Sequence, residues 1–544
     1  MKKVLAMFTM LALAIVVFAA CGGAGNEAPA QQQPGATGVE PSAGTPDSWL
    51  VPERTYITIA TTLAPNWAHP DVGMFWQWLE EYTNVAVNWV TFPSAEGGEQ
   101  FALMMAGGNL PDAFIGGFGG GTSNILLYGM ELGVYIPLND LLATYAPNFM
   151  RRAELAMPGI MSIITAPDGN IYALPTIHPP GERVYNSTAI NQTWLDNLGL
   201  DVPTTIEEVE YVLRAFRDGD PNGDGSNVIP LSFLFADWGA ADHSWWYAPF
   251  GIPLSNDLIM IENGRVVFQA AQEGFRDATR WLASLYAEGL VDVEVFTYDQ
   301  TSYRARAASD PPVFGIWSSW SPWEDAGASG HHYTTILPPI QGPGGAHVLW
   351  NQTTGISRDQ FIITQAASDP SLLIRWIDIF YRDVYTSIRA SRGPGPDPNM
   401  AWYITDDGLV RWVTPVADEF IRGMNEHPFA PGAMGLEIRE APPLTPNLKA
   451  EHIENVLMPY AENFFNGTWN RWPTVFMMPE ESDEISFIES DMVSFARQRQ
   501  ARWIANEGDI DAEWYQFLDD LNAFGLQRWL EIRQAVYDRF IAAN

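Results

Sequence analysis

The chain is poor in positive charge and above all in lysine. Its 544 residues include 29 Lys and Arg against 65 Asp and Glu, which gives a formal net charge of −36. Lysine occurs only at Lys2, Lys3 and Lys449. A protein this acidic repels the phosphates of nucleic acids and anionic lipid headgroups, so we expect no nucleic-acid partner.

Cysteine is almost absent too, and the position of the single one is informative. With Cys21 alone, no disulfide can form within the chain. Two lysines precede an apolar run from Val4 to Ala20, which ends in two alanines directly before Cys21. This is the order of a secretory signal, and the small residues before Cys resemble the cleavage site of bacterial lipoproteins. We predict a signal peptide at residues 1–20 and lipidation of Cys21; the alternative is a plain transmembrane anchor.

Long apolar runs are lacking after Cys21, so the rest of the chain is expected on the extracellular face of the membrane. Residues 21–53 are rich in Gly, Ala, Pro, Gln, Ser and Thr without a periodic apolar pattern. This composition is typical of a flexible tether, which would reach on the order of 30 Å from the membrane.

Beyond the tether, hydrophobic residues are plentiful. They make up 47% of the chain, and 22 of them are tryptophans. This is the composition of a folded protein, and the length predicts two or three domains.

Segments with strand and helix patterns alternate along the first half of the chain. We predict strands at 56–60, 85–90, 110–115 and 183–186, and helices at 74–83, 101–106 and 205–216. Such alternation favours an α/β fold with parallel sheets, and two such units without sequence repetition favour two lobes. The last third is mainly helical, with amphipathic patterns over 482–506 and 512–543.

A series of motifs runs in order along the chain: Ala106–Asp112, Gly133–Pro147, Asp168–Pro175, Asn191–Leu195, Leu198–Leu200, Pro203–Thr205, Glu288–Leu290, Arg375–Tyr381 and Ala535–Arg539. These stretches resemble the large lipoprotein-type extracellular solute-binding proteins of carbohydrate ABC importers. Each motif is weak alone, but their order and spacing cover nearly all of the chain after the tether. The resemblance implies a two-lobed, hinged α/β fold of the periplasmic-binding-protein type (type II), which captures a small polar solute, expected to be a sugar. The implied partners are the permease subunits of an ABC transporter, and a monomer without a required cofactor or catalytic activity is expected.

The resemblance also implies that the chain crosses between the lobes more than once. We expect residues 54–165 and about 310–370 in the first lobe, and about 175–305 and 375–544 in the second. Val313–Trp317 has the strand character that a return to the first lobe needs. A cleft between hinged lobes is a common small-molecule site that closes around its ligand.

A calcium site is one interpretation of the loop that follows the helix at 205–216. Oxygen-bearing side chains alternate there and glycine stands at the sixth position, as in the first half of a calcium loop. The candidate ligands are Asp218, Asp220, Asn222, Asp224 and the carbonyl of Ser226. The second half departs from the pattern, because Val228 and Leu231 stand where ligands are expected. The alternative is an ordinary Asx-Gly turn.

Aromatic and acidic residues suggest the ligand site, because sugar faces stack on indole rings and sugar hydroxyls bind carboxylates. The candidates are Trp67, Trp238, Asp242, Trp245, Trp317 and Trp320. The alternative for each tryptophan is the hydrophobic core. Neighbours Trp245 and Trp246 cannot face the same side of a strand, so one of them is expected in the core. The glycine-rich run Gly116–Gly121 could bring backbone amides to a ligand or form a solvated loop.

Two other functions remain open at this point. A secreted carbohydrate-active enzyme would need two carboxylates about 5–9.5 Å apart across its substrate. A surface adhesion protein would need a flat apolar patch instead of a cleft. The chain contains neither the phosphate-binding loop motif nor G-x-S-x-G nor H-E-x-x-H.

Overall fold

The computed structural model describes a set of ranges that covers most of the chain after the tether. They are residues 50–63, 69–177, 187–235, 241, 243–319, 322–327, 334–345, 355–392, 402–404, 410–412, 432–433, 456 and 469–543. The expected signal peptide, Cys21 and nearly all of the tether lie outside the described residues, as does the strand expected at 183–186.

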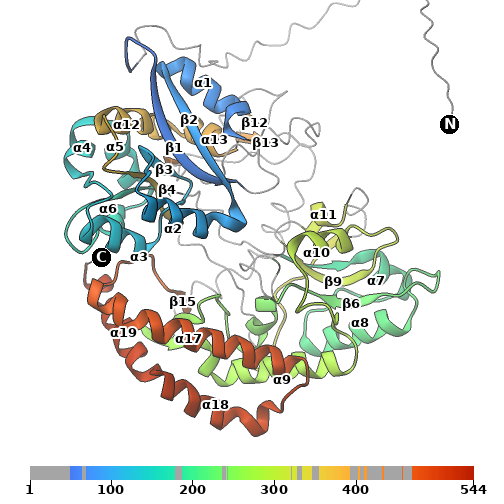
Figure 1. The fold of residues 1–544 in the computed structure, drawn as a ribbon. Coiled ribbons are helices and arrows are strands. Elements are labelled where there is room, and N and C mark those ends of the chain that lie inside the picture. The colour runs from blue at the N-terminus through green and yellow to red at the C-terminus, as the bar shows by residue number, and fades with distance from the viewer. Residues whose placement is uncertain are drawn as a thin grey trace, which may run out of the picture. The chain divides into compact units, whose positions relative to one another are not determined.

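A six-stranded sheet forms the centre of the first lobe (Figure 1). In spatial order its strands are β14 (Gly432–Ala433), β4 (Ala173–Ile177), β11 (Ile356–Ile363), β3 (Ala113–Ile115), β1 (Thr55–Leu63) and β2 (Val85–Pro93). β1 runs parallel to β2 and β3, whereas β11 is antiparallel to β3 and β4. The alternation of strands and helices expected between residues 56 and 115 is confirmed.

Helices complete the first lobe. They are η1 (Pro70–Val72), α1 (Met74–Thr83), η2 (Ser94–Glu96), α2 (Gly97–Gly107), α3 (Thr122–Asn124), η3 (Ile125–Glu131), α4 (Asn139–Tyr145), α5 (Pro147–Ala156), α6 (Ile160–Ile164), α12 (Pro370–Asp378), η7 (Ile379–Tyr381) and α13 (Val384–Arg392). Aromatic rings join α1 to α12 and η7. The Trp76 and Trp376 rings stack 6.3 Å apart, and Phe75 meets Phe380 edge-on at 5.1 Å.

The second lobe contains two smaller sheets. One has the order β10 (Thr334–Ile336), β5 (Ser187–Asn191), β9 (Phe314–Ser319) and β6 (Ile229–Ser232), and the other has β15 (Trp469–Arg471), β7 (Ile259–Glu262) and β8 (Arg265–Phe268). A separate hairpin joins β12 (Trp402–Ile404) and β13 (Val410–Trp412). The helices of this lobe before residue 330 are α7 (Gln192–Leu198), α8 (Ile206–Asp218), η4 (His243–Phe250), η5 (Gln269–Ala271), α9 (Glu273–Ala287), α10 (Gln300–Ala307) and α11 (Pro322–Asp325).

The expected helix at 205–216 is confirmed as α8, including its start. The Thr205 hydroxyl accepts a hydrogen bond from the amide of Glu208, and the Glu208 carboxylate accepts from the amide of Thr205. This reciprocal cap satisfies amides that the first helical turn leaves without partners.

The expected division of the chain between the lobes needs two corrections. Strand β9, which contains Val313–Trp317 except for its first residue, pairs with β5 and β6 in the second lobe and does not return to the first. Helices α12 and α13 pack instead into the core of the first lobe, through Leu373, Trp376 and Ala390 among others. An apolar strand or amphipathic helix fits the core of either lobe, so its pattern alone does not select one.

Three C-terminal helices pack on the second lobe (Figure 1). They are α17 (Pro479–Ile504), α18 (Ile510–Phe524) and α19 (Leu526–Ala543), and their apolar residues belong to the second-lobe core. The amphipathic pattern expected over 512–543 is two helices, separated at Gly525, whose φ of 110° favours glycine.

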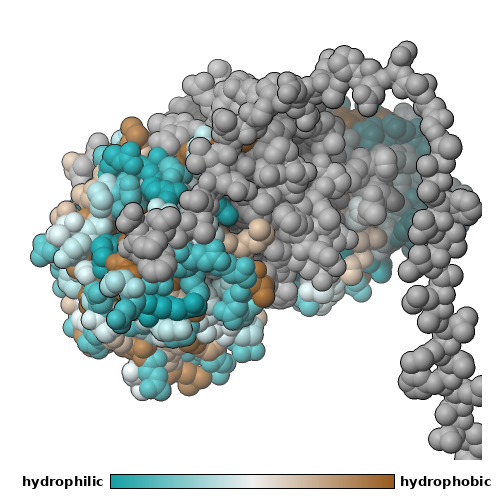
Figure 2. Space-filling view, turned by 90° about the horizontal axis from the view of Figure 1, so that it is seen from above, coloured by the Kyte–Doolittle hydropathy of each residue, from teal (hydrophilic) through white to brown (hydrophobic). Residues whose placement is uncertain are grey.

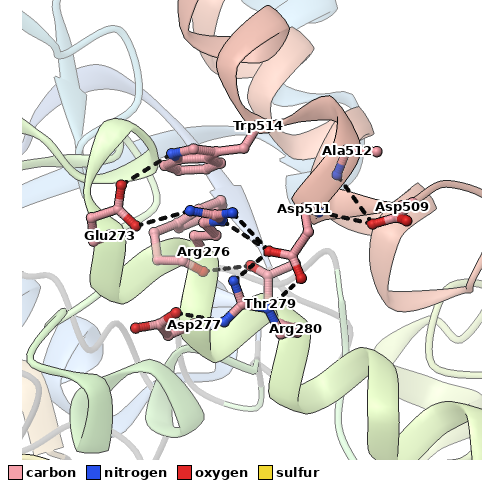
Figure 3. A network of polar contacts seen from close by, with 10 residues as sticks. Glu273, Arg276, Asp277, Thr279, Arg280, Asp509, Asp511, Ala512 and Trp514 are labelled. Atoms are coloured by element: carbon pink, nitrogen blue, oxygen red, sulfur yellow. Dashed lines mark hydrogen bonds and ion pairs between the residues drawn. The ribbon is translucent and has the colours of Figure 1, made fainter.

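Polar contacts add to this packing between α9 and α18 (Figure 3). The carboxylate of Asp511 accepts hydrogen bonds from Arg276 at 2.8 Å and from Arg280 at 2.9 Å. The indole N–H of Trp514 donates to Glu273 at 3.3 Å, and the Arg276 guanidinium lies 5.7 Å from the centre of the Trp514 ring.

On the face drawn in Figure 2, the described surface is mainly hydrophilic and its hydrophobic residues are scattered. Within the described ranges, none of the helices combines the length and the apolar character that crossing a bilayer requires.

Candidate functional site

A polar pocket of about 420 Å³ is lined by described residues of both lobes. The first lobe supplies the loop after β3 and one end of β11, and the second lobe supplies the start of β7 and the segment after β15. Its lining consists of Gly117, Gly121, Thr122, Asp257, Ile259, Ile356, Arg358, Asp359, Gln360 and Trp472–Val475.

An irregularity in β11 accounts for the polar wall of this pocket. Ser357 pairs with Thr176 and Phe361 pairs with Leu174. The chain thus advances four residues in β11 but only two in β4 between these pairs, which is a β-bulge. In a regular strand, neighbouring side chains point to opposite faces. The bulge breaks this alternation and allows Arg358, Asp359 and Gln360 all to line one pocket.

The Arg358 and Asp359 side chains form a buried ion pair. Arg358 donates from Nε to Asp359 Oδ1 and from Nη2 to Oδ2, both at 2.7 Å, and also from Nη2 to the Thr122 hydroxyl at 3.0 Å. Asp359 Oδ2 further accepts from the amide of Gly121 at 3.0 Å. Bidentate geometry with additional hydrogen bonds is what a buried charge pair requires to offset its desolvation.

The glycine-rich run after β3 fits closely against β11. A Cβ on Gly120 would lie 2.8 Å from both Asp359 Cβ and the Asp359 carbonyl oxygen, so only glycine allows this approach. The amides of Gly116, Gly120 and Gly121 bond to acceptors in the protein itself. These three amides are therefore not free to bind a ligand. The run still contributes Gly117 and Gly121 to the lining of the pocket.

The aromatic residues expected to bind ligand divide into two groups. Trp67, Trp238, Asp242 and Trp320 lie outside the described residues, and their role stays a prediction. Trp245 and Trp317 are only 3% and 1% exposed and belong to the core of the second lobe. In this conformation they present no surface to a ligand, so the structure supports the core interpretation for both.

The local structure explains the burial of Trp245. The segment that contains it is the helix η4, not a strand, and Trp246 is buried as well. The expectation that one of the two tryptophans lies in the core was based on strand geometry, and the structure buries both of them in a helix.

The loop after α8 shows features of both interpretations given above. Asp220 Oδ1 accepts from the amide of Gly225 at 3.0 Å, and Gly223 and Gly225 have positive φ angles of 71° and 70°. Asp224 accepts from the amide of Ser226, and hydrogen bonds from Ser226 lower the pKa of this carboxyl. Two carboxylates thus stand in one tight loop.

Other candidate ligands in the loop are engaged elsewhere. Asn222 Oδ1 accepts from the indole N–H of Trp194 at 2.7 Å. Asp218 is paired with Arg217, whose hydrogen bonds lower the pKa of the Asp218 carboxyl. Leu231 lies fully buried in β6. In the described part of the chain, no three His, Cys, Asp or Glu side chains are grouped so that they could hold a metal.

With this geometry in hand, comparison with known proteins identifies the family. The family model described as bacterial extracellular solute-binding protein matches residues 67–378. The chain belongs to this family.

Relatives extend the likeness over most of the chain. The fructooligosaccharide ABC transporter substrate-binding protein FusA of Streptococcus pneumoniae is 30% identical over 513 residues, 90% of each chain. Lipoprotein LipO of Bacillus subtilis is 25% identical over 301 residues, 51% of this chain and 54% of LipO.

Solved structures of FusA are similar along their whole length. FusA in complex with kestose has a TM-score of 0.79 at 29% identity, over 90% of this chain and 100% of FusA. A FusA EF-hand mutant in complex with fructo-nystose has the same TM-score. The expected two-lobed, periplasmic-binding-protein-like α/β fold is confirmed.

Sequence reasoning missed the residues of this solute-binding protein that line the pocket in β11. The available signal was the polar run from Ser357 to Gln360, which stands between apolar residues of one strand, Ile356–Ile363. A polar run inside a buried strand is informative because buried polar groups need hydrogen-bond partners, from the protein or from a ligand.

Proposed function

We propose that this protein captures an oligosaccharide outside the cell and delivers it to the permease of an ABC importer. The observation that carries the proposal is the likeness to FusA along 90% of both chains, since FusA is a fructooligosaccharide-binding protein of such a transporter. The polar pocket lined from both lobes supports it, because a solute bound there touches both lobes at once.

Isothermal titration calorimetry tests this proposal directly. Purified protein from residue 22 onward is titrated with kestose and then with a panel of other oligosaccharides and monosaccharides. We expect saturable binding of at least one oligosaccharide and a raised melting temperature with the same compound, because a ligand of the folded state stabilises it. Absence of binding across the whole panel would contradict the proposal.

The rival interpretation as a carbohydrate-active enzyme makes a different prediction. A binding protein returns its ligand unchanged, so we expect the bound oligosaccharide to be recovered intact after prolonged incubation. Chromatography of the sugar before and after incubation measures this. Release of shorter sugars in proportion to protein concentration would favour the enzyme.

The same proposal places the protein on the outer face of the membrane through lipidated Cys21, as a monomer. It is supported by the apolar run before the only cysteine and by the likeness to the lipoprotein LipO. Cys21→Ser should release the protein from membranes or leave it uncleaved. Unchanged processing and membrane retention of this variant would overturn the anchor.

We also propose that the loop from Asp218 to Ser226 holds a structural Ca²⁺ through Asp220, Asp224 and the Ser226 carbonyl. The tight loop with two carboxylates supports this, as does the existence of an EF-hand in FusA. A chelator should lower the melting temperature and calcium should restore it, and Asp220→Ala combined with Asp224→Ala should abolish the response. If the parent protein shows no calcium dependence, the loop is an Asx-Gly turn.

A further inference from the structure

Two polar atoms of the pocket wall lack partners although they are buried. Arg358 Nη1, a donor, and Gln360 Oε1, an acceptor, find no hydrogen-bond partner among the described residues. Both side chains line the pocket. Leaving such groups unsatisfied costs free energy, so a native protein that keeps them in a pocket points to a ligand that satisfies them.

The surroundings of Arg358 restrict what this ligand can be. Asp359 accepts hydrogen bonds from Nε and Nη2, and Nη2 also donates to the Thr122 hydroxyl. The Phe476 ring covers one face of the guanidinium at 3.7 Å. The guanidinium charge is therefore already neutralised, and Nη1 remains as an unpaired donor with two N–H groups. The exposed Asp257 adds a further negative charge to the lining.

We propose that this pocket binds a neutral sugar unit and selects against uronates. One sugar hydroxyl accepts from Arg358 Nη1, and another donates to Gln360 Oε1. A hydroxyl both donates and accepts, so neighbouring hydroxyls of one sugar unit can satisfy both atoms. A uronate carboxylate would meet Asp257 and, among the described lining residues, no cation free of an acidic partner. This selectivity rests on the proposed function and deepens it.

The decisive variant is Gln360→Met, which keeps the shape of the side chain and removes its polar end. Because Oε1 has no partner in the protein, the melting temperature should stay the same or rise. The affinity for kestose, or for the neutral oligosaccharide that binds best, should fall by about 3- to 10-fold, the value of one hydrogen bond. Gln365→Met, at an exposed glutamine outside the pocket lining, is the matched control and should change neither quantity.

A second variant protects the test against misfolding. Arg358→Lys keeps a positive charge beside Asp359 but removes the directed Nη1 donor, and it should also weaken neutral-sugar binding. If both variants keep their melting temperature and bind as tightly as the parent, the site assignment is wrong even though the protein binds sugar. If the parent binds no oligosaccharide at all, the proposed function fails first and the site assignment fails with it.

Selectivity is tested with trigalacturonate beside the neutral ligand in buffers of low ionic strength. The parent should bind the uronate at least about tenfold more weakly, and Asp257→Asn should narrow this gap while Asp201→Asn, at an exposed acid outside the lining, leaves it unchanged. Equal affinity of the parent for both ligands overturns the selectivity.

Discussion

Each lobe buries a glutamine, and the two side chains differ in how they are satisfied. Gln269 in the second lobe is fully buried; its Oε1 accepts from the amide of Ser255 at 2.7 Å and its Nε2 donates to the carbonyl of Pro253. Gln360 in the first lobe is 9% exposed, and its Oε1 has no partner in the described protein.

This difference shows that burial alone does not tell whether a polar side chain serves the fold or a ligand; its hydrogen-bond partners have to be known as well. A satisfied amide such as that of Gln269 fixes the turn before β7 and belongs to the fold. An unsatisfied amide that lines a pocket contributes little to stability and is available to a ligand. The second lobe should therefore respond to mutation mainly in stability, and the pocket wall of the first lobe mainly in affinity.

The largest expected effect concerns Trp317 in the second-lobe core. Trp317→Ala should lower the free energy of unfolding by about 3–5 kcal/mol, the usual cost of truncating a buried Trp, as measured by urea denaturation. Sugar affinity of the protein that remains folded should not change, because the ring is buried. If Trp317→Ala kept the stability of the parent but lost sugar affinity, Trp317 would be a ligand-binding residue and the comparison of the two lobes would be wrong.

The next largest effect is expected for Gln269→Leu, which should lower the free energy of unfolding by about 2–4 kcal/mol. This change leaves the Ser255 amide and the Pro253 carbonyl buried without partners. The free energy of unfolding of Gln360→Met should lie within about 0.5 kcal/mol of the parent value. Urea denaturation of both variants therefore compares a structural glutamine with a glutamine of the pocket wall. Equal losses in the two variants would mean that both glutamines are structural.

A buried histidine gives the second lobe a pH dependence. Burial lowers the pKa of His243 well below its ordinary value of 6.5, and its Nε2 lies 2.9 Å from Gln500 Nε2. As the pH falls below 6.5, the unfolded chain takes up a proton that the folded protein does not. Stability should therefore fall with decreasing pH by at most about 1.4 kcal/mol per unit, until the pH reaches the folded pKa.

Denaturation between pH 7.5 and 5 measures this slope. His243→Asn does not titrate there and should flatten the curve, while His69→Asn, at an exposed histidine, serves as control. An unchanged slope in His243→Asn would assign the pH dependence to other groups.

Many helices and strands of this fold could be predicted from sequence because local residue patterns determine where they begin and end. Helix α1 begins and ends at the expected residues, Met74 and Thr83, and the cap at Thr205 is where Glu208 predicts it. Which lobe a segment joins was not predictable, as β9 shows, because sheet partners are chosen by the whole core.

The candidate site was harder to predict. Trp317 and Trp245 fit the composition of a sugar site as well as that of a core, and only tertiary burial separates the two. Arg358, Asp359 and Gln360 reach one pocket through a bulge, and no spacing rule in a single sequence reveals that.

The smallest expected effect concerns the polar contacts that join α18 to α9. Asp511 accepts from Arg276 and Arg280, yet its side chain is 51% exposed, so water competes for the same groups. Exposed ion pairs contribute about 0–1 kcal/mol and weaken in salt. Asp511→Ala should therefore cost at most about 1 kcal/mol in low salt and close to nothing at about 1 M NaCl.

Trp514 provides the contrast within the same contact, because its ring is fully buried. Trp514→Ala should cost about 3–5 kcal/mol at either salt concentration, as expected for apolar packing. Urea denaturation of both variants at two salt concentrations separates the contributions. If Asp511→Ala instead lost a large, salt-sensitive part of its free energy of unfolding, charge and not apolar packing would hold the C-terminal helices on the second lobe. The stability of that lobe would then depend on surface ion pairs as well as on its core.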